Sequence, residues 1–245
     1  MHAKTQSQLN SPFKMFDLSG FSLWGLKTGE KGFDYDLAGS PGKERLVFSL
    51  KGEISVNGTP LQVKDMMYLP LGEAAKIKSA GPATLFIAET TGSEMYQPYL
   101  KKYSDAQKMK IGQPTFRRTV VQSITESDPA NRFIAGYVED SIGEWSSYPP
   151  HKHDDKPEAY IYFGLDPGFG VQLILDGEDE KAFVVHDYDA VLIPKGYHPH
   201  VNTSLRGGSY AWVISAPPTS RNLGVEIHPA FKEVNLGKSH LSIKE

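Results

Sequence analysis

Two histidines and a glutamate lie close together in the second half of the sequence, at a spacing that suits metal binding. His151 and His153 are two residues apart, and Glu158 follows five residues after His153. On an extended strand, side chains at positions i and i+2 point to the same face, so both imidazoles can point in one direction. Pro149 and Pro150 directly before them disfavour a helix. Two neutral imidazoles and a carboxylate form a partial ligand set for a divalent transition metal.

A complete site needs a fourth ligand, and the segment 194–202 offers two candidates, His198 and His200. Five of the eight histidines of the chain lie between positions 151 and 200, and none lies between positions 3 and 150. A single histidine is more often structural or solvated than a ligand. A cluster of this density instead favours a metal site.

The composition narrows the class of protein. Of the 245 residues, 39% are hydrophobic and 22% are charged, as is typical of a globular protein in water. The formal net charge of −3 predicts no nucleic-acid partner. No apolar run approaches the roughly 18 residues that span a membrane, and the N-terminus lacks the apolar core of a signal peptide, so we expect no membrane partner and a cytoplasmic location. With no cysteine, the chain has no disulfide, thiolate ligand or cysteine nucleophile.

Short β-strands dominate the predicted secondary structure of the first half. Residues 46–50 and 85–88 are apolar runs of strand length. Asn57 and Gly58 follow an alternating segment and form the strongest short hairpin signal that a sequence offers. No long segment has the 3.6-residue period of an amphipathic helix, and residues 94–110 are the nearest candidate for a short one. The pattern predicts an all-β fold.

An internal repeat divides the chain into two halves. Residues 65–72 align without a gap with residues 189–196, and both segments have Asp, Pro and Gly at the same positions. Duplication on this scale implies two copies of one supersecondary plan, here two all-β barrels. We therefore predict an N-terminal barrel over residues 1–105 and a C-terminal barrel over residues 106–245.

The two copies differ at the candidate ligands. In the register of the repeat, Ala74 takes the place of His198. If Glu44 is aligned with Glu158, a leucine and a glycine occupy the positions of the two spaced histidines. The N-terminal barrel is thus expected to lack metal ligands and to have a structural role, either packing against its twin or forming an oligomer contact.

The order of these motifs resembles the cupin superfamily, in which an HxH pair with a later Glu is followed by a Pro-x-Gly stretch with His and Asn. The resemblance implies a bicupin, with two tandem jelly-roll-like barrels. It also implies the choice of the fourth ligand, because His198 and Asn202 match the family's His-x₃-Asn spacing. His200 is then a spare ligand or an acid–base group.

Longer segments resemble a narrower family of sugar-acid isomerases. Residues 145–154, 168–172 and 191–199 are similar to 5-deoxy-glucuronate isomerase of inositol catabolism, whereas residues 117–119 and 151–163 resemble 5-keto-4-deoxyuronate isomerase of pectin breakdown. Both are two-cupin aldose–ketose isomerases. The four-residue loop before the ligand glutamate matches the pectin enzyme, and the Pro-x-Gly-Tyr-His-Pro form matches the inositol enzyme. The first activity is favoured, with the second as the alternative.

This resemblance implies one divalent metal ion in the C-terminal barrel and a small sugar-acid substrate. The metal would polarise a carbonyl as a Lewis acid, and a nearby acid or base would move the proton. A ligand set without sulfur leaves zinc, manganese, iron and nickel open, and the resemblance favours zinc. We also expect a homo-oligomer. The alternatives from other classes are a cupin oxygenase and a sugar-acid-binding cupin without catalysis.

Strand parity identifies two candidate catalytic phenols. Tyr160 and Tyr162 have the same parity as Glu158, so all three side chains are expected to face the barrel interior. The phenols could donate hydrogen bonds to a substrate hydroxyl, as could His200 in an acid–base role. The alternative is a pair of core tyrosines with satisfied hydroxyls.

Two further residues are candidates for substrate binding. A guanidinium binds a carboxylate through two parallel hydrogen bonds, so Arg118, or its neighbour Arg117, could hold the acid group of the sugar. The alternative is a solvated arginine at a strand end. Trp145 and Tyr148 precede the candidate ligands and are expected to line the mouth of the site.

Overall fold

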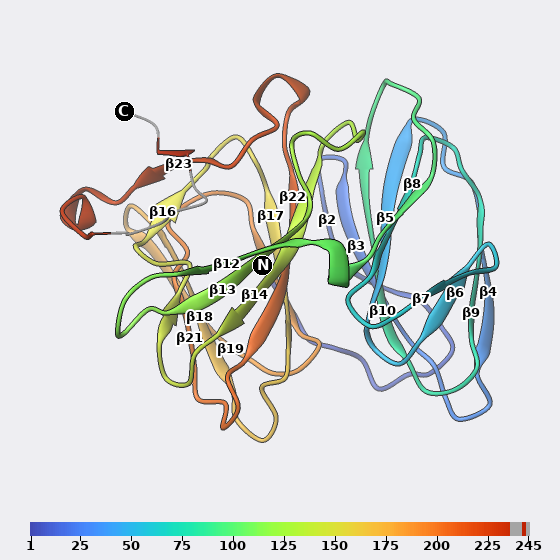
Figure 1. Ribbon diagram of the computed structural model, residues 1–245, viewed down its shortest axis with the longest axis horizontal. Coiled ribbons are helices and arrows are strands. Elements are labelled where there is room, and N and C mark those ends of the chain that lie inside the picture. Colours follow the sequence, from blue (N-terminus) through green and yellow to red (C-terminus); the bar gives the residue numbers. More distant parts are fainter. Residues whose placement is uncertain (236–241, 244–245) are drawn as a thin grey trace. The chain divides into compact units, whose positions relative to one another are not determined.

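The computed structural model describes residues 1–235 and 242–243, and these residues are almost entirely β-strands and loops (Figure 1). The predicted all-β fold is confirmed. Helical structure within the described residues is limited to short 3-10 turns: η1 (Tyr103–Asp105), η2 (Pro218–Ser220) and η3 (Pro229–Phe231).

The expected short helix over residues 94–110 is wrong except for η1 at its centre. A strand, β11 (Tyr99–Lys101), precedes this turn, and β12 (Gln107–Ile111) follows it. Ile111 is buried in the core and Met109 packs partly against it, while the alternate residues Lys108 and Lys110 are exposed. The side-chain period is therefore two, and pairing with a neighbouring strand overrides the weak helical pattern.

The chain divides into two compact units. The N-terminal unit contains Thr5–Ala106 and Ser127–Phe133. The C-terminal unit contains Met1–Lys4, Gln107–Glu126 and the described residues from Ile134 on. Each unit thus includes a short segment from the other half of the sequence, and hydrogen bonds hold each segment in its unit.

Two antiparallel sheets form the N-terminal unit. The six-stranded sheet has the order β11, β8 (Met66–Leu69), β5 (Lys43–Lys51), β10 (Thr84–Thr91), β3 (Phe21–Lys27) and β2 (Phe13–Leu18). The four-stranded sheet has the order β4 (Phe33–Leu37), β9 (Ala75–Ser79), β6 (Ile54–Val56) and β7 (Thr59–Leu61).

The predicted Asn57-Gly58 hairpin is present between β6 and β7. Both turn residues have positive φ angles, 49° and 79°, which the two-residue hairpin turns of this kind require. Val56 therefore pairs with Thr59. The alternation that follows places Ile54, Val56 and Leu61 in the apolar core of this unit.

Three sheets form the C-terminal unit (Figure 1). The seven-stranded sheet has the order β1 (His2–Ala3), β20 (Ala190–Ile193), β17 (Glu158–Phe163), β22 (Ser209–Ser215), β14 (Phe133–Asp140), β13 (Arg118–Ile124) and β12. The four-stranded sheet has the order β15 (Trp145–Ser146), β21 (His200–Asn202), β18 (Gly170–Asp176) and β19 (Asp179–Val185). The three-stranded sheet has the order β16 (His151–Lys152), β23 (Gly224–Ile227) and β24 (Ser242–Ile243).

The first residues of the chain belong to the C-terminal unit because β1 forms an edge of its largest sheet. His2 pairs with Val191, and the amino group of Met1 donates to the carbonyl of Leu192 at 2.9 Å. The interior of this sheet is apolar and aromatic, with Tyr160, Tyr162 and other buried side chains in one cluster.

Glu44 explains why residues 127–133 belong to the N-terminal unit. Its fully buried carboxylate accepts hydrogen bonds from the backbone N–H groups of Asn131 and Arg132 at 2.7 and 2.8 Å, and from that of Phe133 at 3.3 Å. The amide of Asn131 and the hydroxyl of Tyr68 donate to the same carboxylate. A buried charge is tolerated when its lone pairs are satisfied in this way.

This arrangement predicts that Glu44→Gln destabilises the N-terminal unit. The new amide N–H₂ faces N–H donors in place of an acceptor, which should cost about 2–4 kcal/mol. Urea denaturation followed through the fluorescence of Trp24 in β3 would measure the loss in the free energy of unfolding. Glu53→Gln, at an exposed position, is the matched control. A loss no larger than that of the control would contradict the role given to Glu44.

Candidate metal centre and adjoining cavity

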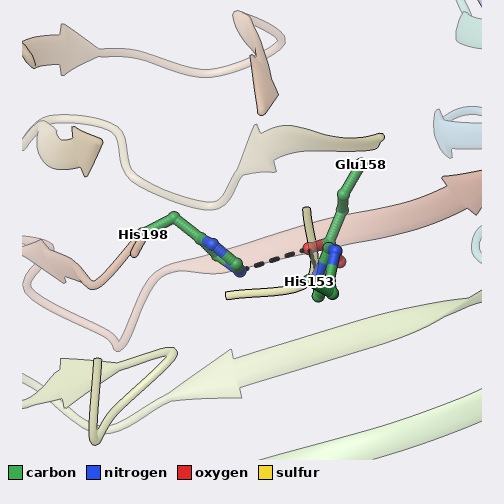
Figure 2. A group of neighbouring side chains, drawn as sticks. All are labelled: His153, Glu158 and His198. Carbon is green, nitrogen blue, oxygen red and sulfur yellow. Dashed lines mark hydrogen bonds and ion pairs between the residues drawn. The ribbon is translucent and has the colours of Figure 1, made fainter. Parts of the chain in front are cut away.

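Three predicted ligands converge inside the C-terminal unit. Figure 2 shows the imidazoles of His153 and His198 directed at the carboxylate of Glu158. The Nε2 atom of His153 lies 3.0 Å from Oε2 of Glu158, and the Nε2 atom of His198 lies 3.4 Å from the same oxygen. All three side chains are buried, and their ligand atoms lie within 4.8 Å of one another, as a shared metal ion requires.

The fourth predicted ligand, His151, is close to this group. Its ring centroid is 4.9 Å from that of His198, and its side chain lines the same cavity as His153 and Glu158. His151 begins β16, where it pairs with Ile227 of β23. The structure thus brings all four predicted ligands into one region of the unit.

Different elements hold these ligands. Glu158 begins β17 in the middle of the large sheet, where it pairs with Ile193 on one side and Ile214 on the other. His198 lies in the loop after β20. Gly196 shapes this loop, because its φ is +92° and a Cβ atom there would meet the carbonyl of Leu175 at 2.9 Å.

The three histidines share one hydrogen-bond pattern that fixes their lone pairs. The Nδ1 atoms of His151, His153 and His198 lie 2.8–2.9 Å from the backbone carbonyls of Pro149, Lys156 and Gly196, respectively. A carbonyl only accepts, so each Nδ1 carries the proton and donates it. In the neutral imidazole, each Nε2 then presents a lone pair, which is the tautomer of metal-binding histidines.

This pattern creates a conflict that a cation resolves. The Nε2 lone pairs of His153 and His198 would face the carboxylate oxygen of Glu158, so acceptors would meet acceptors. Nε2 of His198 also has no hydrogen-bond partner within the described part of the chain, although it is completely buried. Buried acceptors of this kind are stabilised by a proton or a metal ion between them. The donor set, nitrogen and oxygen without sulfur, therefore fits a divalent transition metal.

The electrostatics agree with a site that attracts positive charge. Burial favours the neutral carboxyl, but when protons rather than a metal ion lie between the groups, His153 and His198 donate to Glu158 and carry positive charge, which outweighs burial and lowers the pKa of Glu158 to about 2. Burial also opposes charge on His153, yet Glu158 raises its pKa overall. Burial and the neighbouring His198 hold the pKa of His151 well below its usual value, so that His151 is a neutral donor.

A partly open cavity adjoins the candidate ligands; the space in it that the centres of water molecules can occupy is about 40 Å³, and its empty space together with the solvent at its mouth is about 490 Å³. Its wall combines a few polar and charged side chains with apolar and aromatic ones, as is common for small-molecule sites. Three of the four candidate ligands, His151, His153 and Glu158, line it. The other lining residues are Arg118, Val120, Val138, Ser147, Tyr160, Tyr210, Trp212, Ile214, Asn222, Leu223, Gly224 and Val225.

The two candidate arginines have different environments. Arg118 is buried and lines the cavity, and its guanidinium donates to the carbonyls of Phe116 and Tyr148 at 3.0 and 2.8 Å. Burial lowers the pKa of Arg118, although an arginine remains charged at any physiological pH. Arg117, by contrast, is exposed and pairs with Glu144. Of the two, Arg118 is the one in the cavity.

The three candidate catalytic residues also differ in whether they line the cavity. Tyr160 lines the cavity, with its hydroxyl 3.1 Å from Oγ of Ser147, and burial raises its pKa well above the usual value so that the phenol stays protonated. Tyr162 donates instead to Gln172 at 2.8 Å. Nδ1 of His200 lies 3.2 Å from Oγ of Ser146. Neither Tyr162 nor His200 is among the cavity-lining residues.

Trp145 and Tyr148 are both half-buried, and neither is a lining residue. The ring of Tyr148 packs between Phe116 and Phe231, at centroid distances of 5.0 and 5.7 Å. Its backbone carbonyl is the part that contributes to the site, because it accepts from Arg118.

Several lining residues were not predicted from the sequence. Tyr210 and Trp212 alternate along β22 and face the cavity, and Tyr210 stacks on Tyr160 with a centroid distance of 4.3 Å. The alternating segment 209–215 carries the signal that could have identified them. Ser147 and Asn222 lie in loops and have no comparable signal.

The N-terminal unit places an arginine where the C-terminal unit has Glu158. Arg45 pairs with Leu69, and Glu158 pairs with Ile193, the residue that aligns with Leu69 in the repeat. Aligning Glu44 with Glu158 was therefore wrong by one residue, which on a strand reverses the direction of the side chain.

This buried arginine takes over the region that the ligands occupy in the other unit. The guanidinium of Arg45 donates to the carbonyls of Ala38 and Glu73. Glu73 directly precedes Ala74, the counterpart of His198. The N-terminal unit thus carries its own fixed cation at this position.

The solved structures that resemble this chain show its fold. An IolB-like protein from Salmonella typhimurium LT2 superposes with a TM-score of 0.82 at 18% identity, covering 94% of this chain and 97% of that one. Oxalate decarboxylase of Lactobacillus farciminis, a cupin, gives a TM-score of 0.64 at 12% identity, covering 88% and 84% of the two chains. Fold and internal repeat together define a two-barrel cupin.

The chain belongs to the KduI/IolB family, whose sequence model matches residues 2–234. A 5-deoxy-glucuronate isomerase from Geobacillus kaustophilus is 30% identical over 162 residues, which cover 62% of this chain and 59% of the relative. A 4-deoxy-L-threo-5-hexosulose-uronate ketol-isomerase from Cereibacter sphaeroides is 26% identical over 170 residues, covering 67% and 62%. The chain thus matches about three fifths of the length of these curated relatives. None of the helical turns among residues 1–235 is long and apolar enough to cross a membrane.

Proposed function

We propose that this chain is a metal-dependent aldose–ketose isomerase of a uronic-acid-derived sugar, with 5-deoxy-glucuronate as the first candidate substrate. One observation carries the proposal: a single cavity combines a His/Glu cluster that calls for a cation with the buried guanidinium of Arg118. The names of the 30% identical relatives support the substrate. The ketol-isomerase relatives, together with the short loop between His153 and Glu158, favour 4-deoxy-L-threo-5-hexosulose-uronate as the second candidate.

The proposed reaction moves one proton between neighbouring carbons and one between their oxygens. A divalent ion, when bound, would supply Lewis acidity toward the carbonyl group of the sugar. The residues that would hold it are His151, His153, Glu158 and His198. Zinc is the first candidate, and manganese, iron and nickel share the preference for these donors. Oxalate decarboxylase of Bacillus subtilis, a more distant structural neighbour, has Mn(II) centres.

The remaining lining residues would bind and orient the sugar acid. Arg118 offers a fixed guanidinium to the carboxylate, and burial strengthens this interaction by excluding water. Tyr160 offers a protonated phenol, oriented by Ser147, that can donate to a sugar oxygen and exchange its proton. Tyr162 and His200 remain predicted catalytic groups. Their positions favour an indirect role, through Gln172 and Ser146 respectively.

The first prediction is that the purified protein binds one divalent metal ion per chain. His198→Ala should weaken binding by at least about tenfold, since even the loss of a second-shell partner has an effect of this size. Elemental analysis after dialysis against buffered metal would measure occupancy. His186→Ala, at an exposed position away from the ligands, is the matched control. Two equivalents per chain, or full occupancy in His198→Ala, would contradict the ligand set.

A second prediction concerns recognition of the carboxylate. Arg118→Gln should raise KM for a uronate by about ten- to a hundredfold, the range for a lost hydrogen bond to a charged group. Arg117→Gln, at the exposed neighbour, should change KM less than about twofold. The uronamide of the same sugar, which lacks the negative charge, provides the decisive comparison. The increase in KM caused by Arg118→Gln should be much smaller with this amide. An equal increase in KM with both substrates would argue against a contact between Arg118 and the carboxylate.

The third prediction is the reaction itself. Metal-loaded protein incubated with 5-deoxy-glucuronate or 4-deoxy-L-threo-5-hexosulose-uronate in D₂O should give the ketose–aldose isomer without oxygen uptake. NMR should show deuterium at the carbon that receives the proton, provided that the proton-carrying group exchanges with solvent. Tyr160→Phe should lower kcat by about a hundredfold, as is usual for loss of a general acid or base, and Tyr162→Phe should have a smaller effect.

The other outcomes of this experiment identify the alternative functions. Binding of uronates without turnover, at full metal occupancy, would indicate a sugar-acid-binding cupin. Oxygen consumption with cleavage of the sugar would indicate an oxygenase.

A further inference from the structure

Lys156 is buried in the short loop that joins two of the candidate ligands. Only 1% of its surface is exposed, although lysine is among the residue types least often buried. It follows His153 by three residues and precedes Glu158 by two. A charge in this position needs specific hydrogen-bond partners to be stable.

Its ammonium group finds these partners in one segment of the chain. Nζ of Lys156 donates to the carbonyl of Asn222 at 3.0 Å, to Oδ1 of the same residue at 2.9 Å, and to the carbonyl of Gly224 at 3.3 Å. These three acceptors match the three donors of an ammonium group. Oδ1 of Asn222 also accepts from the backbone N–H of Gly224 at 2.8 Å, so the lysine binds at the centre of a tight turn.

This turn forms one wall of the cavity. Residues 222–225 all line it, and Leu223 also packs against the apolar core of the barrel. The wall continues into β23, which pairs with His151. We call residues 222–225 the cavity wall.

Lys156 also contacts the ligand loop through its backbone. Its carbonyl accepts from Nδ1 of His153 at 2.8 Å, and its N–H donates to the carbonyl of His153 at 3.2 Å. One residue therefore fixes the orientation of a candidate ligand and, through its side chain, the position of the facing wall.

We infer that Lys156 is a positioning residue that holds the cavity wall against the ligand loop and so sets how closely the cavity fits its substrate. This inference rests on the proposed function only in taking the cavity as the substrate site.

Other contacts hold the residues before the wall, so the effect of Lys156 should be local. Oγ of Ser220 donates to Asp155 at 2.9 Å, and Arg221 donates to the carbonyls of Thr125 and Glu126. Removal of the ammonium should therefore leave the segment attached and loosen the wall alone.

Lys156→Met tests the inference, because methionine has a similar length and no donors. The protein should keep its metal content, and Trp212, which lines the cavity and is 4% exposed, should become accessible. In a Trp24→Phe/Trp145→Phe background, acrylamide quenching of Trp212 should rise at least about twofold. Substrate KM should rise about tenfold while kcat changes less than about threefold, the pattern of lost ground-state and transition-state binding. Lys110→Met, at an exposed position of β12, is the matched control.

The outcomes separate this inference from the proposed function. Unchanged quenching of Trp212 in folded, metal-loaded Lys156→Met would overturn it, as would a fall in kcat with no change in KM. Loss of metal from Lys156→Met would also overturn the inference, because the role of Lys156 would then be to hold the ligand loop and not the cavity wall. Absence of isomerase activity in the parent protein would refute the proposed function, while the quenching would still test the wall. If Lys156→Met does not fold, Asn222→Ala decides: increased quenching supports the inference and unchanged quenching overturns it.

Discussion

The buried carboxylate of Glu158 imposes the main constraint on the C-terminal unit. It faces the Nε2 atoms of two imidazoles whose Nδ1 protons are already committed to backbone carbonyls. This arrangement is stable only with positive charge among the three groups. The surrounding structure maintains the geometry. Glu158 is fixed in the central sheet, and His198 is fixed by a loop whose glycine, Gly196, admits no Cβ atom without displacing backbone. The barrel therefore prepares a cation site, rather than merely tolerating a buried carboxylate.

The N-terminal unit meets the same need with a different cation. Its strand register places Arg45 at the position of Glu158. The guanidinium has no lone pair to offer a metal ion, and it donates hydrogen bonds to the carbonyls of Ala38 and Glu73. Because this cation is part of the chain, no external ion is needed at this position of the N-terminal unit. Its adjacent carboxylate, Glu44, points the other way and accepts backbone hydrogen bonds from residues 131–133. One duplicated strand thus carries a candidate metal ligand in one unit and a buried structural cation in the other.

The sequence predicts those features that depend on short-range pattern. The all-β fold, the Asn57-Gly58 hairpin and the tandem repeat follow from alternation, turn chemistry and self-similarity. The spaced histidines and Glu158 were identified in the same way, and the structure brings them together. The one-residue error at Glu44 arose because a local match cannot fix register without the neighbouring strands. The choice of Arg118 over Arg117, and the burial of Lys156, depend on contacts with residues far away in the sequence, which no local pattern encodes.

This distribution of contacts separates two tasks within the C-terminal unit. Among the candidate ligands, His151 and Glu158 lie on strands and are fixed by sheet hydrogen bonds. His153 and His198 lie in adjoining loops, where hydrogen bonds from Nδ1 to backbone carbonyls orient them. The groups that shape the rest of the cavity, such as Ser147 and the wall of residues 222–225, lie on connecting segments held by side-chain contacts. Segments of this kind can change without disturbing the sheet. Relatives named for two different sugar acids are both similar to this chain in sequence. We therefore expect the difference between their substrates to lie in the connecting segments, with the cation-binding strands kept in common.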